Sequence, residues 1–513
     1  MSAYDAIVVG AGPNGLTTAA LLAKAGRKVL VLERRDVIGG AAASEEFHTG
    51  YRTVGLLHDT SGVRPGVVDA LSLAGYGLEL SPDPKSIFVP DPKSGGLFLH
   101  HDPEQAAPEI EPFSERDIAA YKGYREFLGE IREVVGRVMD RPPPNLSDLG
   151  GKDKLSLLWT GWMLRRLGRK KMMEVMRIGT MCVADSLNER FETDLLKVAL
   201  AGPAIFPSFT GPWSPGTALN LLLWESACRG SVVGGPRALI ASLERAATAS
   251  GATIRTGAEV QQILIREGGV RGVRLGGGEE IDCTVVATSC DPRRTFLELI
   301  DSREIPFRLE HRIRHFRGRG TTAKVNLALD GPLEFAGRSG EFFQFVRTAT
   351  DLDAMEKSFD PVKYDELPEN PSLDICVPTV ESPDLAPDGH SVVSILAHFV
   401  PYRLKEGWTD ATRKELGDTV IRTLSTYAPT LPSQIVGKEV LVPPDLEERY
   451  GLVEGHLYHG DHASDQLVLR PTPECANYRT PVNGLFLCGS GSHPGGGITC
   501  APGALAARTI LEQ

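Results

Sequence analysis

Near its start, the chain alternates short apolar runs with glycine-containing turns. Ala6–Val9 is an unbroken apolar run, typical of a strand buried on both faces. Leu16–Ala25 is rich in alanine and leucine and stops before Gly26, which predicts a helix with a glycine end. Lys28–Leu32 predicts a second strand. The order is therefore strand, turn, helix and strand within about thirty residues.

A unit of similar order lies at the other end of the chain. Asn483-Gly484 predicts a turn and Leu485–Cys488 a buried strand. A glycine-rich segment, residues 489–497, leads to a helix predicted over Ala501–Leu511. A flexible loop is the alternative for this segment, but the rigid His493-Pro494 pair disfavours it. We therefore expect the two ends of the chain to build one site.

Between these units the pattern predicts one helix and then a meander of strands. The helix follows Gly234-Gly235-Pro236 and runs to Ala249. No second strand–glycine–helix unit is found, so a dedicated NAD(P)H domain is not expected. The strands are expected at 251–255, 257–263, 270–275 and 280–287, with glycine turns at 268–269 and 276–278.

Length and composition indicate a globular protein with more than one core. The chain has 513 residues, 42% of them hydrophobic and 24% charged. A net charge of −11 argues against a general nucleic-acid binder. The sequence has no run of 18 or more apolar residues, and no secretory leader precedes the first strand. We expect a protein that is cytoplasmic or peripheral to the inner face of a membrane.

The first turn has the glycine spacing of a dinucleotide-binding motif. Gly10 permits a tight turn, Gly12 lets the backbone approach a pyrophosphate, and Gly15 lets the helix pack closely on the strand. Pro13 and Asn14 precede the predicted helix, whose free N–H groups and dipole favour phosphate. The alternative is a plain strand-to-helix turn. The complete context predicts that these five residues contact a nucleotide cofactor.

The segment after the second strand extends this site. Glu33 lies eighteen residues after the last glycine of the motif, where a carboxylate can accept hydrogen bonds from a ribose. Arg34 makes the following turn basic. Gly39, Gly40 and Ala41 then allow a second close approach of backbone to a long ligand. A nicotinamide domain does not need such a pair here, so the pattern favours FAD.

Both glycine segments resemble those of a known family, the phytoene-desaturase-type FAD oxidoreductases. The resemblance extends over nearly the whole chain and is greatest to the group called pyridine nucleotide-disulphide oxidoreductase domain-containing protein two. The disulphide part of that name does not fit, because none of the eight cysteines forms a CxxC pair. The matching segments are 10–15, 33–35, 39–42, 233–236, 442–447, 465–467 and 487–497.

The resemblance implies an α/β fold, with a Rossmann-like FAD-binding domain of two-domain flavoprotein type and a mixed α+β substrate or cap domain. It implies one non-covalent FAD, with Val260 against the adenine. Gly489, Gly496, Gly497 and Ile498 are further expected cofactor contacts. The expected domains are 1–60, 230–292 and 470–513 for FAD, and 61–229 and 293–469 for the substrate.

The resemblance also implies an activity. We expect an FAD-dependent dehydrogenase, desaturase or isomerase that moves hydride between flavin N5 and an apolar, polyene or lipid-like substrate. One alternative is an amine-oxidase-like enzyme, and another is a non-catalytic interaction protein stabilised by FAD. His493 is the candidate catalytic residue, since it lies in the second glycine segment. Its alternative role is to fix that loop by hydrogen bonds.

Three histidines, His456, His459 and His462, lie at three-residue spacing near Asp461. A metal site is conceivable from these residue types. However, Gly460 and its neighbours indicate a loop without the helical spacing that would aim the ligands together. No metal is expected.

One stretch of the middle region, residues 155–176, combines apolar and basic residues. Leu155–Leu164 is apolar with Trp159 and Trp162, and Arg165–Lys171 is strongly basic. This mixture suits a helix that lies in a membrane surface. The alternative is a cap-domain helix with a solvated basic face.

Overall fold

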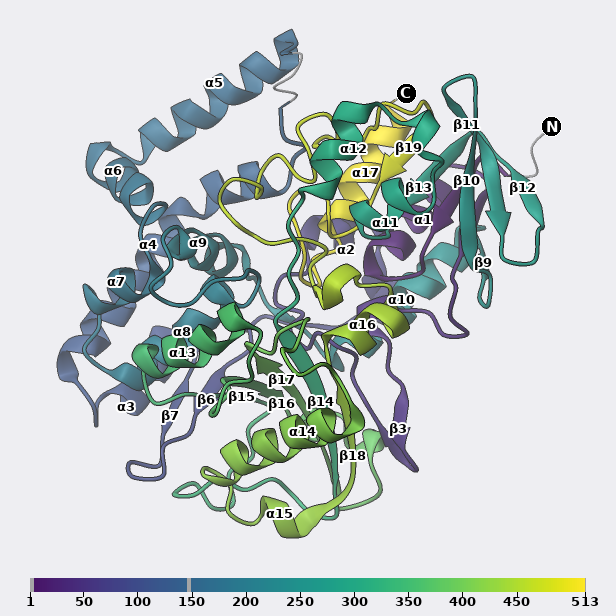
Figure 1. Cartoon of the computed structure of the whole chain (residues 1–513). Helices are drawn as coiled ribbons and strands as arrows, with labels where there is room; N and C mark the ends of the chain where they lie inside the picture. The colour runs from purple at the N-terminus through teal and green to yellow at the C-terminus, as the bar shows by residue number, and fades with distance from the viewer. Residues whose placement is uncertain (1–3, 145–148, 513) are drawn as a thin grey trace.

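The computed structural model describes residues 4–144 and 149–512. Met1–Ala3 lie outside these residues, and the expectation that no secretory leader precedes the first strand concerns them in part. Two large sheets organise the chain, one built from both ends and the middle of the sequence and the other from strands within residues 87–99 and 322–441 (Figure 1). The first sheet carries the glycine motifs.

The first sheet has five strands, and all its neighbours are parallel. Its inner strands are fully buried, which explains their continuous apolar runs. Val9 pairs with Thr288, and Thr288 pairs with Leu487, so both ends of the chain share one sheet edge. In order across the sheet the strands are β19 (Leu485–Leu487), β13 (Val285–Thr288), β1 (Ala6–Val9), β2 (Val29–Leu32) and β9 (Thr253–Arg255).

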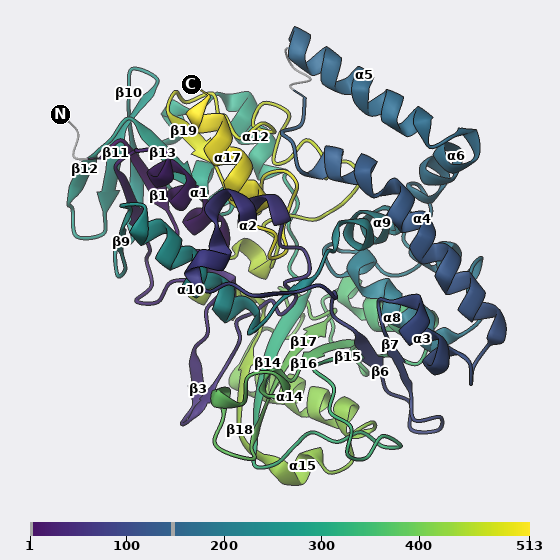
Figure 2. The ribbon, with the colours of Figure 1, turned by 180° about the vertical axis from the view of Figure 1, so that it is seen from behind.

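Helices from three distant segments cover one face of this sheet, as Figure 2 shows from behind. They are α1 (Pro13–Lys24), α10 (Gly235–Ala249) and α17 (Ala501–Leu511). The other face packs on an antiparallel meander and two short helices. These are β10 (Val260–Arg266), β11 (Gly269–Leu275), β12 (Glu280–Asp282), α11 (Pro292–Leu297) and α12 (Phe307–Arg314).

The expectation of one strand over 280–287 is wrong. The chain leaves the meander after Asp282 and enters the parallel sheet at Val285. β12 pairs antiparallel with β11, whereas β13 pairs parallel with β1, so the backbone must turn between them. Helices α11 and α12, beyond the expected boundary at 292, pack on the first sheet. The domain boundaries themselves stay a prediction.

The second sheet has seven strands and mixed directions. Its two longest strands are buried at every residue. Helices α14 (Asp410–Ser425) and α15 (Leu431–Gln434) cover one of its faces. In order the strands are β18 (Ile435–Leu441), β14 (Thr322–Leu329), β17 (Ser391–His398), β16 (Leu373–Cys376), β15 (Phe345–Thr348), β6 (Ile87–Val89) and β7 (Leu97–Leu99).

A helical layer packs beside this sheet around its own apolar core. It contains α3 (Pro103–Ile110), α4 (Glu115–Met139), α7 (Val183–Asn188), α8 (Asp194–Ile205), α9 (Thr217–Ala227) and α13 (Leu352–Phe359). Two further helices, α5 (Gly151–Arg166) and α6 (Arg169–Ile178), form a hairpin, and α5 projects from the body (Figure 1). Throughout residues 4–144 and 149–512, no helix combines the length and apolarity needed to cross a bilayer.

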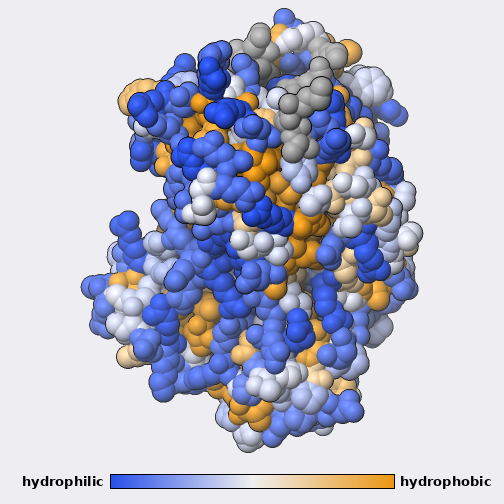
Figure 3. Space-filling model, turned by 90° about the vertical axis from the view of Figure 1, so that its right-hand side faces the viewer, coloured by the Kyte–Doolittle hydropathy of each residue, from blue (hydrophilic) through white to orange (hydrophobic). Residues whose placement is uncertain are grey.

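Short elements complete the fold. Seen from the meander side, the surface is mainly hydrophilic, with smaller hydrophobic patches near its middle (Figure 3). The remaining helices and strands are α2 (Pro65–Leu71), α16 (Pro443–Tyr450), β3 (Glu46–His48), β4 (Tyr51–Arg52), β5 (Leu80–Ser81) and β8 (Ser231–Val232). The 3-10 turns are η1 (Gly40–Ala42), η2 (Leu73–Tyr76), η3 (Ser302–Glu304), η4 (Asp360–Tyr364), η5 (Pro378–Val380), η6 (Pro383–Leu385) and η7 (Val453–Gly455).

Candidate active site

A long cavity, here called the nucleotide cavity, opens at the carboxyl edge of the parallel sheet. Gly10, Glu33 and Ser289 line it, each directly after a strand of that sheet. Ligands of open parallel sheets bind at this edge, where the strand order reverses. The sequence-predicted residues that line the cavity are Gly10, Gly12, Pro13, Asn14, Glu33, Arg34, Gly40, Ala41, Val260, Gly497 and Ile498.

Four predicted cofactor residues lie outside this lining, and three of them shape the cavity from behind. A Cβ on Gly15 would lie 2.0 Å from the Gly10 carbonyl oxygen, so only glycine lets α1 approach the first strand this closely. Gly39 has φ +111°, a left-handed value that favours glycine. A Cβ on Gly489 would lie 2.4 Å from the Ser289 carbonyl oxygen. Gly496 lines a neighbouring cavity instead.

The middle of the nucleotide cavity is a backbone cradle. The Gly12 and Gly40 backbones face each other, and a Cβ on Gly40 would lie 3.2 Å from the Gly12 Cα. The first turn of α1 leaves backbone N–H groups without helical acceptors, and its dipole favours an anion. Asn14 donates through Nδ2 to the Ser490 hydroxyl at 3.2 Å, while its buried Oδ1 has no partner. Both ends of the chain thus meet beside this cradle.

The carboxylate of Glu33 is held at one side of the cavity. Its Oε2 accepts from the Ala11 N–H at 2.8 Å, and its Oε1 accepts from the Arg35 N–H at 3.0 Å. These bonds fix its position but leave lone pairs for a ribose. Arg34, next in the chain, donates through Nη2 to the Glu448 carbonyl oxygen at 2.7 Å. This hydrogen bond holds α16 against the end of the cavity where Arg34 lies.

Sequence reasoning missed part of the lining. Ser289 and Cys290 follow β13, and the only signal for them was the apolar strand that ends there. Leu57 carries no motif of its own, and the segment around α16 matched the family at 442–447 but gave no indication that it would line this cavity. The missed lining residues include Leu57, Glu259, Ser289, Cys290, Arg294, Tyr450, Leu452, Leu457, His459 and Ser490.

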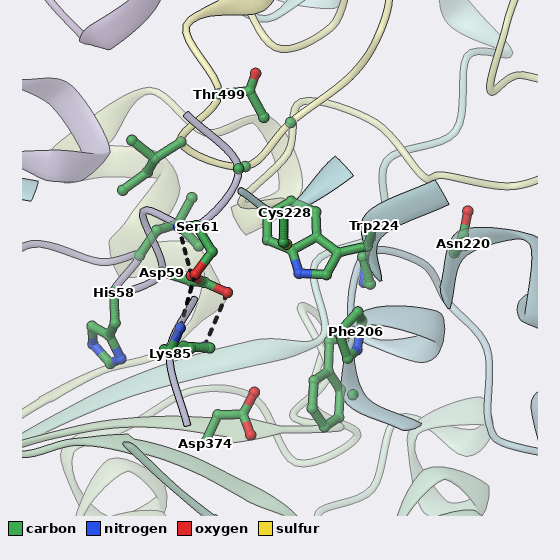
Figure 4. Close-up of a pocket in the computed structure, with 18 of the residues that line it drawn as sticks. His58, Asp59, Ser61, Lys85, Phe206, Asn220, Trp224, Cys228, Asp374 and Thr499 are labelled. Atoms are coloured by element: carbon green, nitrogen blue, oxygen red, sulfur yellow. Dashed lines mark hydrogen bonds and ion pairs between the residues drawn. The ribbon is translucent and has the colours of Figure 1, made fainter. Parts of the chain in front are cut away.

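A second cavity, here called the substrate cavity, adjoins the first. Leu57, Leu457, Gly497 and Ile498 line both, so the two meet at these residues. Its walls come from the seven-stranded sheet, α8, α9 and the second glycine segment (Figure 4). Its apolar lining consists of Leu57, Ile87, Met139, Phe206, Leu223, Trp224, Phe345, Val346, Ile375, Leu396, Leu457, Leu467 and Ile498.

Aromatic side chains close over the glycines at this junction. A Cβ on Gly497 would lie 3.0 Å from the Trp224 ring, and one on Gly496 would lie 2.3 Å from the Tyr458 ring. Both aromatic residues line the substrate cavity. The glycines therefore make room for these rings as well as for a cofactor.

Each carboxylate that lines the substrate cavity has a cationic partner. Asp59 pairs with Lys85 at 3.1 Å, as Figure 4 shows. Glu225 pairs with Arg125 at 2.6 Å. Asp374 binds the guanidinium of Arg347 through both oxygens, at 2.6 and 3.0 Å. The acidic groups of this wall are therefore neutralised within the protein.

The imidazoles of the substrate cavity are held neutral. Burial lowers the pKa values of His58 and His462 well below the usual 6.5, with nearby cations adding to the effect. Burial also lowers the pKa of His398, whose ring stacks on Phe206. His101 has its pKa lowered to about 3 by burial and by Arg125. The histidines of the cavity therefore present neutral imidazoles to a ligand.

Lys324 lies behind the junction of the two cavities, on the fully buried strand β14 of the second sheet. Its side chain is 1% exposed, and its Nζ donates to the Leu56 carbonyl oxygen at 3.2 Å and contacts His58 Nε2. Burial lowers its pKa to about 7. Because Leu57 lies between these two contacts, Lys324 positions a residue that lines both cavities.

Replacing this lysine with methionine is expected to change how stability depends on pH. Folded wild type releases the Lys324 proton near pH 7, whereas the unfolded chain keeps it to about 10.5, so the free energy of unfolding rises with pH between these values. The slope is up to about 1.4 kcal/mol per pH unit. Thermal unfolding of the holoprotein from pH 7 to 9.5 should show this rise for wild type and lose it for Lys324→Met. The surface variant Lys357→Met should keep it, and an unchanged slope in Lys324→Met would show that Lys324 is not the titrating group.

His493 does not line either cavity. Its imidazole is 1% exposed, and its Nε2 lies 2.8 Å from the Val138 carbonyl oxygen at the end of α4. Tyr478 donates its hydroxyl to the His493 carbonyl oxygen at 3.0 Å. These contacts favour the loop-fixing alternative over a catalytic role, because the ring is turned toward α4.

The side chains of the three spaced histidines lie in different surroundings. His456 Nε2 pairs with Asp461 at 3.1 Å, and His462 Nε2 accepts from the Gly496 N–H at 3.0 Å. His459 lines the nucleotide cavity. They support the loops around the two cavities from different directions.

The residues of the nucleotide cavity fit FAD. A cradle of glycines that a Cβ would fill, an unpaired buried Asn14 Oδ1 and a fixed carboxylate at Glu33 lie along one cavity. From Val260 this cavity continues to Ile498, where the substrate cavity begins. The fold and the site therefore define a two-domain flavoprotein of the FAD-dependent oxidoreductase class. The particular family is identified by comparison with known proteins.

The chain belongs to the flavin containing amine oxidoreductase family, whose model matches residues 14–507. It is 32% identical to pyridine nucleotide-disulfide oxidoreductase domain-containing protein 2 of Rattus norvegicus over 99% of this chain and 94% of the rat protein. The resemblance drawn from the motifs is thereby confirmed.

More distant relatives and solved structures agree with this placement. The chain is 28% identical to a limonene dehydrogenase component of Castellaniella defragrans, over 99% of this chain and 94% of that protein. It is 25% identical to hydroxyneurosporene desaturase of Rhodobacter capsulatus, over 100% and 98%. A putrescine oxidase solved with putrescine bound has a TM-score of 0.58 and 15% identity, over 99% of both chains. That likeness shows the fold.

Proposed function

We propose that this chain is an FAD-dependent dehydrogenase, desaturase or isomerase that moves hydride between flavin N5 and an apolar, polyene or lipid-like substrate. We propose further that FAD is held non-covalently. The observation that carries this proposal is the substrate cavity, which adjoins the nucleotide cavity, is mostly apolar, and pairs each of its carboxylates with a cation. A charged substrate would have to displace one of these pairs.

The residues of the two cavities would have different roles in binding. Glu33, Asn14 and the glycine cradle would hold the nucleotide end of FAD. Gly497 and Ile498, which line both cavities, would hold the flavin end against the substrate. A bound flavin supplies the hydride acceptor or donor at N5. The protein then has to orient an apolar substrate against that ring and exclude water, which the aliphatic and aromatic walls do.

The named activities of two relatives support an apolar substrate. One is a component of a limonene dehydrogenase and another is a hydroxyneurosporene desaturase, and both names denote oxidation of isoprenoids. At identities of 28% and 25%, these names support the substrate class alone.

Amine oxidation is the second candidate function. Trp224 and Tyr458 pack on neighbouring glycines where the cavities meet, and aromatic faces there suit a cation or an amine. The putrescine oxidase likeness concerns the fold only. Against this candidate, Asp59, Glu225 and Asp374 already have cationic partners, so an ammonium group would find no free carboxylate among them.

An anaerobic substrate screen tests the proposal. The purified holoprotein should be yellow, and an acyclic polyene or a monoterpene in detergent should bleach the flavin band, whereas putrescine should leave it unchanged. Bleaching by putrescine alone would favour amine oxidation. If dithionite bleaches the flavin but no compound in the screen does, the interaction-protein alternative is supported. Heat denaturation should release all flavin into the supernatant, and flavin retained on the precipitated chain would contradict non-covalent binding.

A further inference from the structure

The hairpin of α5 and α6 presents an apolar surface that the protein body does not cover. On α5 the exposed residues Leu155, Leu158, Trp159 and Trp162 follow the spacing i, i+3, i+4, i+7, which is one helical face. Their exposed fractions are 67%, 71%, 48% and 45%. Such a stripe is normally turned toward a core.

The opposite side of α5 is the one that packs on the protein. Thr160 accepts a hydrogen bond from Arg137 Nε of α4 at 3.2 Å, and Met163 is 8% exposed. The orientation of the helix is therefore fixed by its contacts with α4. Arg137 also lies over the ring of the stripe residue Trp159 at 5.9 Å, yet all four stripe residues stay at least 45% exposed. The stripe is a feature of the folded chain and not an unpacked core.

The second helix continues this surface. Met173 and Met176 of α6 are 55% and 56% exposed. Together with Leu157, the hairpin carries seven of the eighteen exposed large hydrophobic residues found among the described residues. By contrast, the side of the molecule seen in Figure 3 is mainly hydrophilic. The hairpin is therefore richer in exposed apolar side chains, for its length, than the rest of the described chain.

The charge of the hairpin is opposite to that of the chain. Residues 151–178 contain eight lysines and arginines and two acidic residues, whereas the whole chain has a net charge of −11. The Arg166 guanidinium lies over the Trp162 ring at 4.8 Å, and the two tryptophan rings stack at 4.7 Å. Tryptophan beside arginine and lysine suits the boundary between lipid headgroups and acyl chains.

We infer that the α5–α6 hairpin docks this protein on an anionic lipid bilayer. The apolar stripe enters the headgroup boundary and the basic residues pair with anionic headgroups, each contributing about 1 kcal/mol near the surface. The docked hairpin also brings the substrate cavity close to lipid, because Met139 at the end of α4 lines that cavity. Docking itself does not depend on the proposed reaction.

Vesicle flotation of the holoprotein tests this inference. Most of the wild type should float with phosphatidylcholine vesicles that contain about 30% phosphatidylglycerol, and much less with pure phosphatidylcholine, since the attraction is partly electrostatic. The triple variant Leu158→Ser, Trp159→Ser and Trp162→Ser should lose at least about tenfold in partitioning, because each buried apolar side chain contributes about 1.5–3 kcal/mol. Replacing Arg165, Arg166, Lys170 and Lys171 with glutamine should remove the preference for anionic lipid.

A matched control variant and fluorescence quenching by lipid distinguish docking through the hairpin from nonspecific binding. Phe307→Ser with Tyr364→Ser removes two exposed hydrophobic residues elsewhere, 80% and 71% exposed, and should partition like wild type. Vesicles with brominated acyl chains should quench wild-type tryptophan fluorescence, and the Trp159→Phe, Trp162→Phe variant should lose most of that quenching. Each variant must keep its flavin absorbance and its unfolding midpoint.

Two outcomes would overturn the inference. The wild type would stay at the bottom of the gradient with anionic vesicles, or light scattering without lipid would reveal a dimer that the triple variant abolishes. In the second case a second copy of the chain, and not a bilayer, covers the stripe. Failure of the substrate screen leaves this result untouched, since flotation needs no substrate.

Discussion

The Gly15→Ala variant is expected to lose FAD almost completely. A Cβ at this position would lie 2.0 Å from the Gly10 carbonyl oxygen, so α1 must move away from the glycine turn. Alanine is the better helix former by about 1 kcal/mol, so any loss has to come from this collision. We expect the FAD dissociation constant to rise at least about 100-fold, or roughly 2.7 kcal/mol. Flavin stoichiometry of the purified variant and FAD titration of the apoprotein measure this.

The chain offers a matched control and a second site for the same experiment. Gly123 lies in α4 with no atom within 4 Å of an added Cβ, so Gly123→Ala should keep its flavin and gain about 1 kcal/mol of stability. Gly503→Ala should behave like Gly15→Ala, because its Cβ would lie 2.2 Å from the Asn14 carbonyl oxygen. If Gly15→Ala retains one FAD per chain, the close packing of α1 is not required for cofactor binding.

The Asp374→Asn variant is expected to destabilise the protein by about 3 kcal/mol. Arg347 is 3% exposed, and its guanidinium packs over Gly202, where an added Cβ would lie 2.2 Å away. Its charge is neutralised by Asp374, which lies directly opposite it across β15 and β16. Asparagine keeps the shape of the carboxylate but leaves this buried cation without a counter-charge. Denaturant unfolding of the holoprotein measures the loss.

A double variant and an exposed ion pair serve as controls that distinguish the effect of the buried charge from that of side-chain packing on stability. Arg347→Met with Asp374→Leu removes both charges and should recover most of the stability lost in Asp374→Asn. Asp384→Asn breaks the exposed pair of Arg237 and Asp384 and should cost at most about 0.5 kcal/mol. Equal losses in Asp374→Asn and Asp384→Asn would mean that burial adds nothing to the pair, contrary to the structure.

The nucleotide half of the site was largely predictable because its signals are local. Strand Ala6–Val9, the glycines of the turn and helix α1 follow one another in the sequence, and each has a pattern of its own. The break between β12 and β13 was missed for the opposite reason. Ile281, Cys283 and Val285 alternate with polar residues as in a single strand, and only the choice of partner strand separates β12 from β13.

The substrate half could not be predicted in the same way. The pairing of Arg347 with Asp374 depends on the register of β15 and β16, which no local pattern fixes. Lys324 has an ordinary sequence context, and its lowered pKa comes from burial on strand β14 of the second sheet. His493 lies in the right segment, but its side chain faces Val138, a residue 355 positions away in the sequence. The sequence indicates where His493 lies along the chain but not the direction of its side chain, and that direction favours the loop-fixing role.

The interleaved first sheet has a consequence for how the protein is made. β1 and α1 leave the ribosome long before β19 and α17, which pack beside β13 and α1. During most of its synthesis the nascent chain therefore carries a parallel sheet that lacks an edge strand and a covering helix. Exposed strand edges of this kind are prone to aggregation, and chaperones protect them. We therefore expect FAD to bind only after the segment that contains Gly497 and Ile498, which line the nucleotide cavity, has been synthesised.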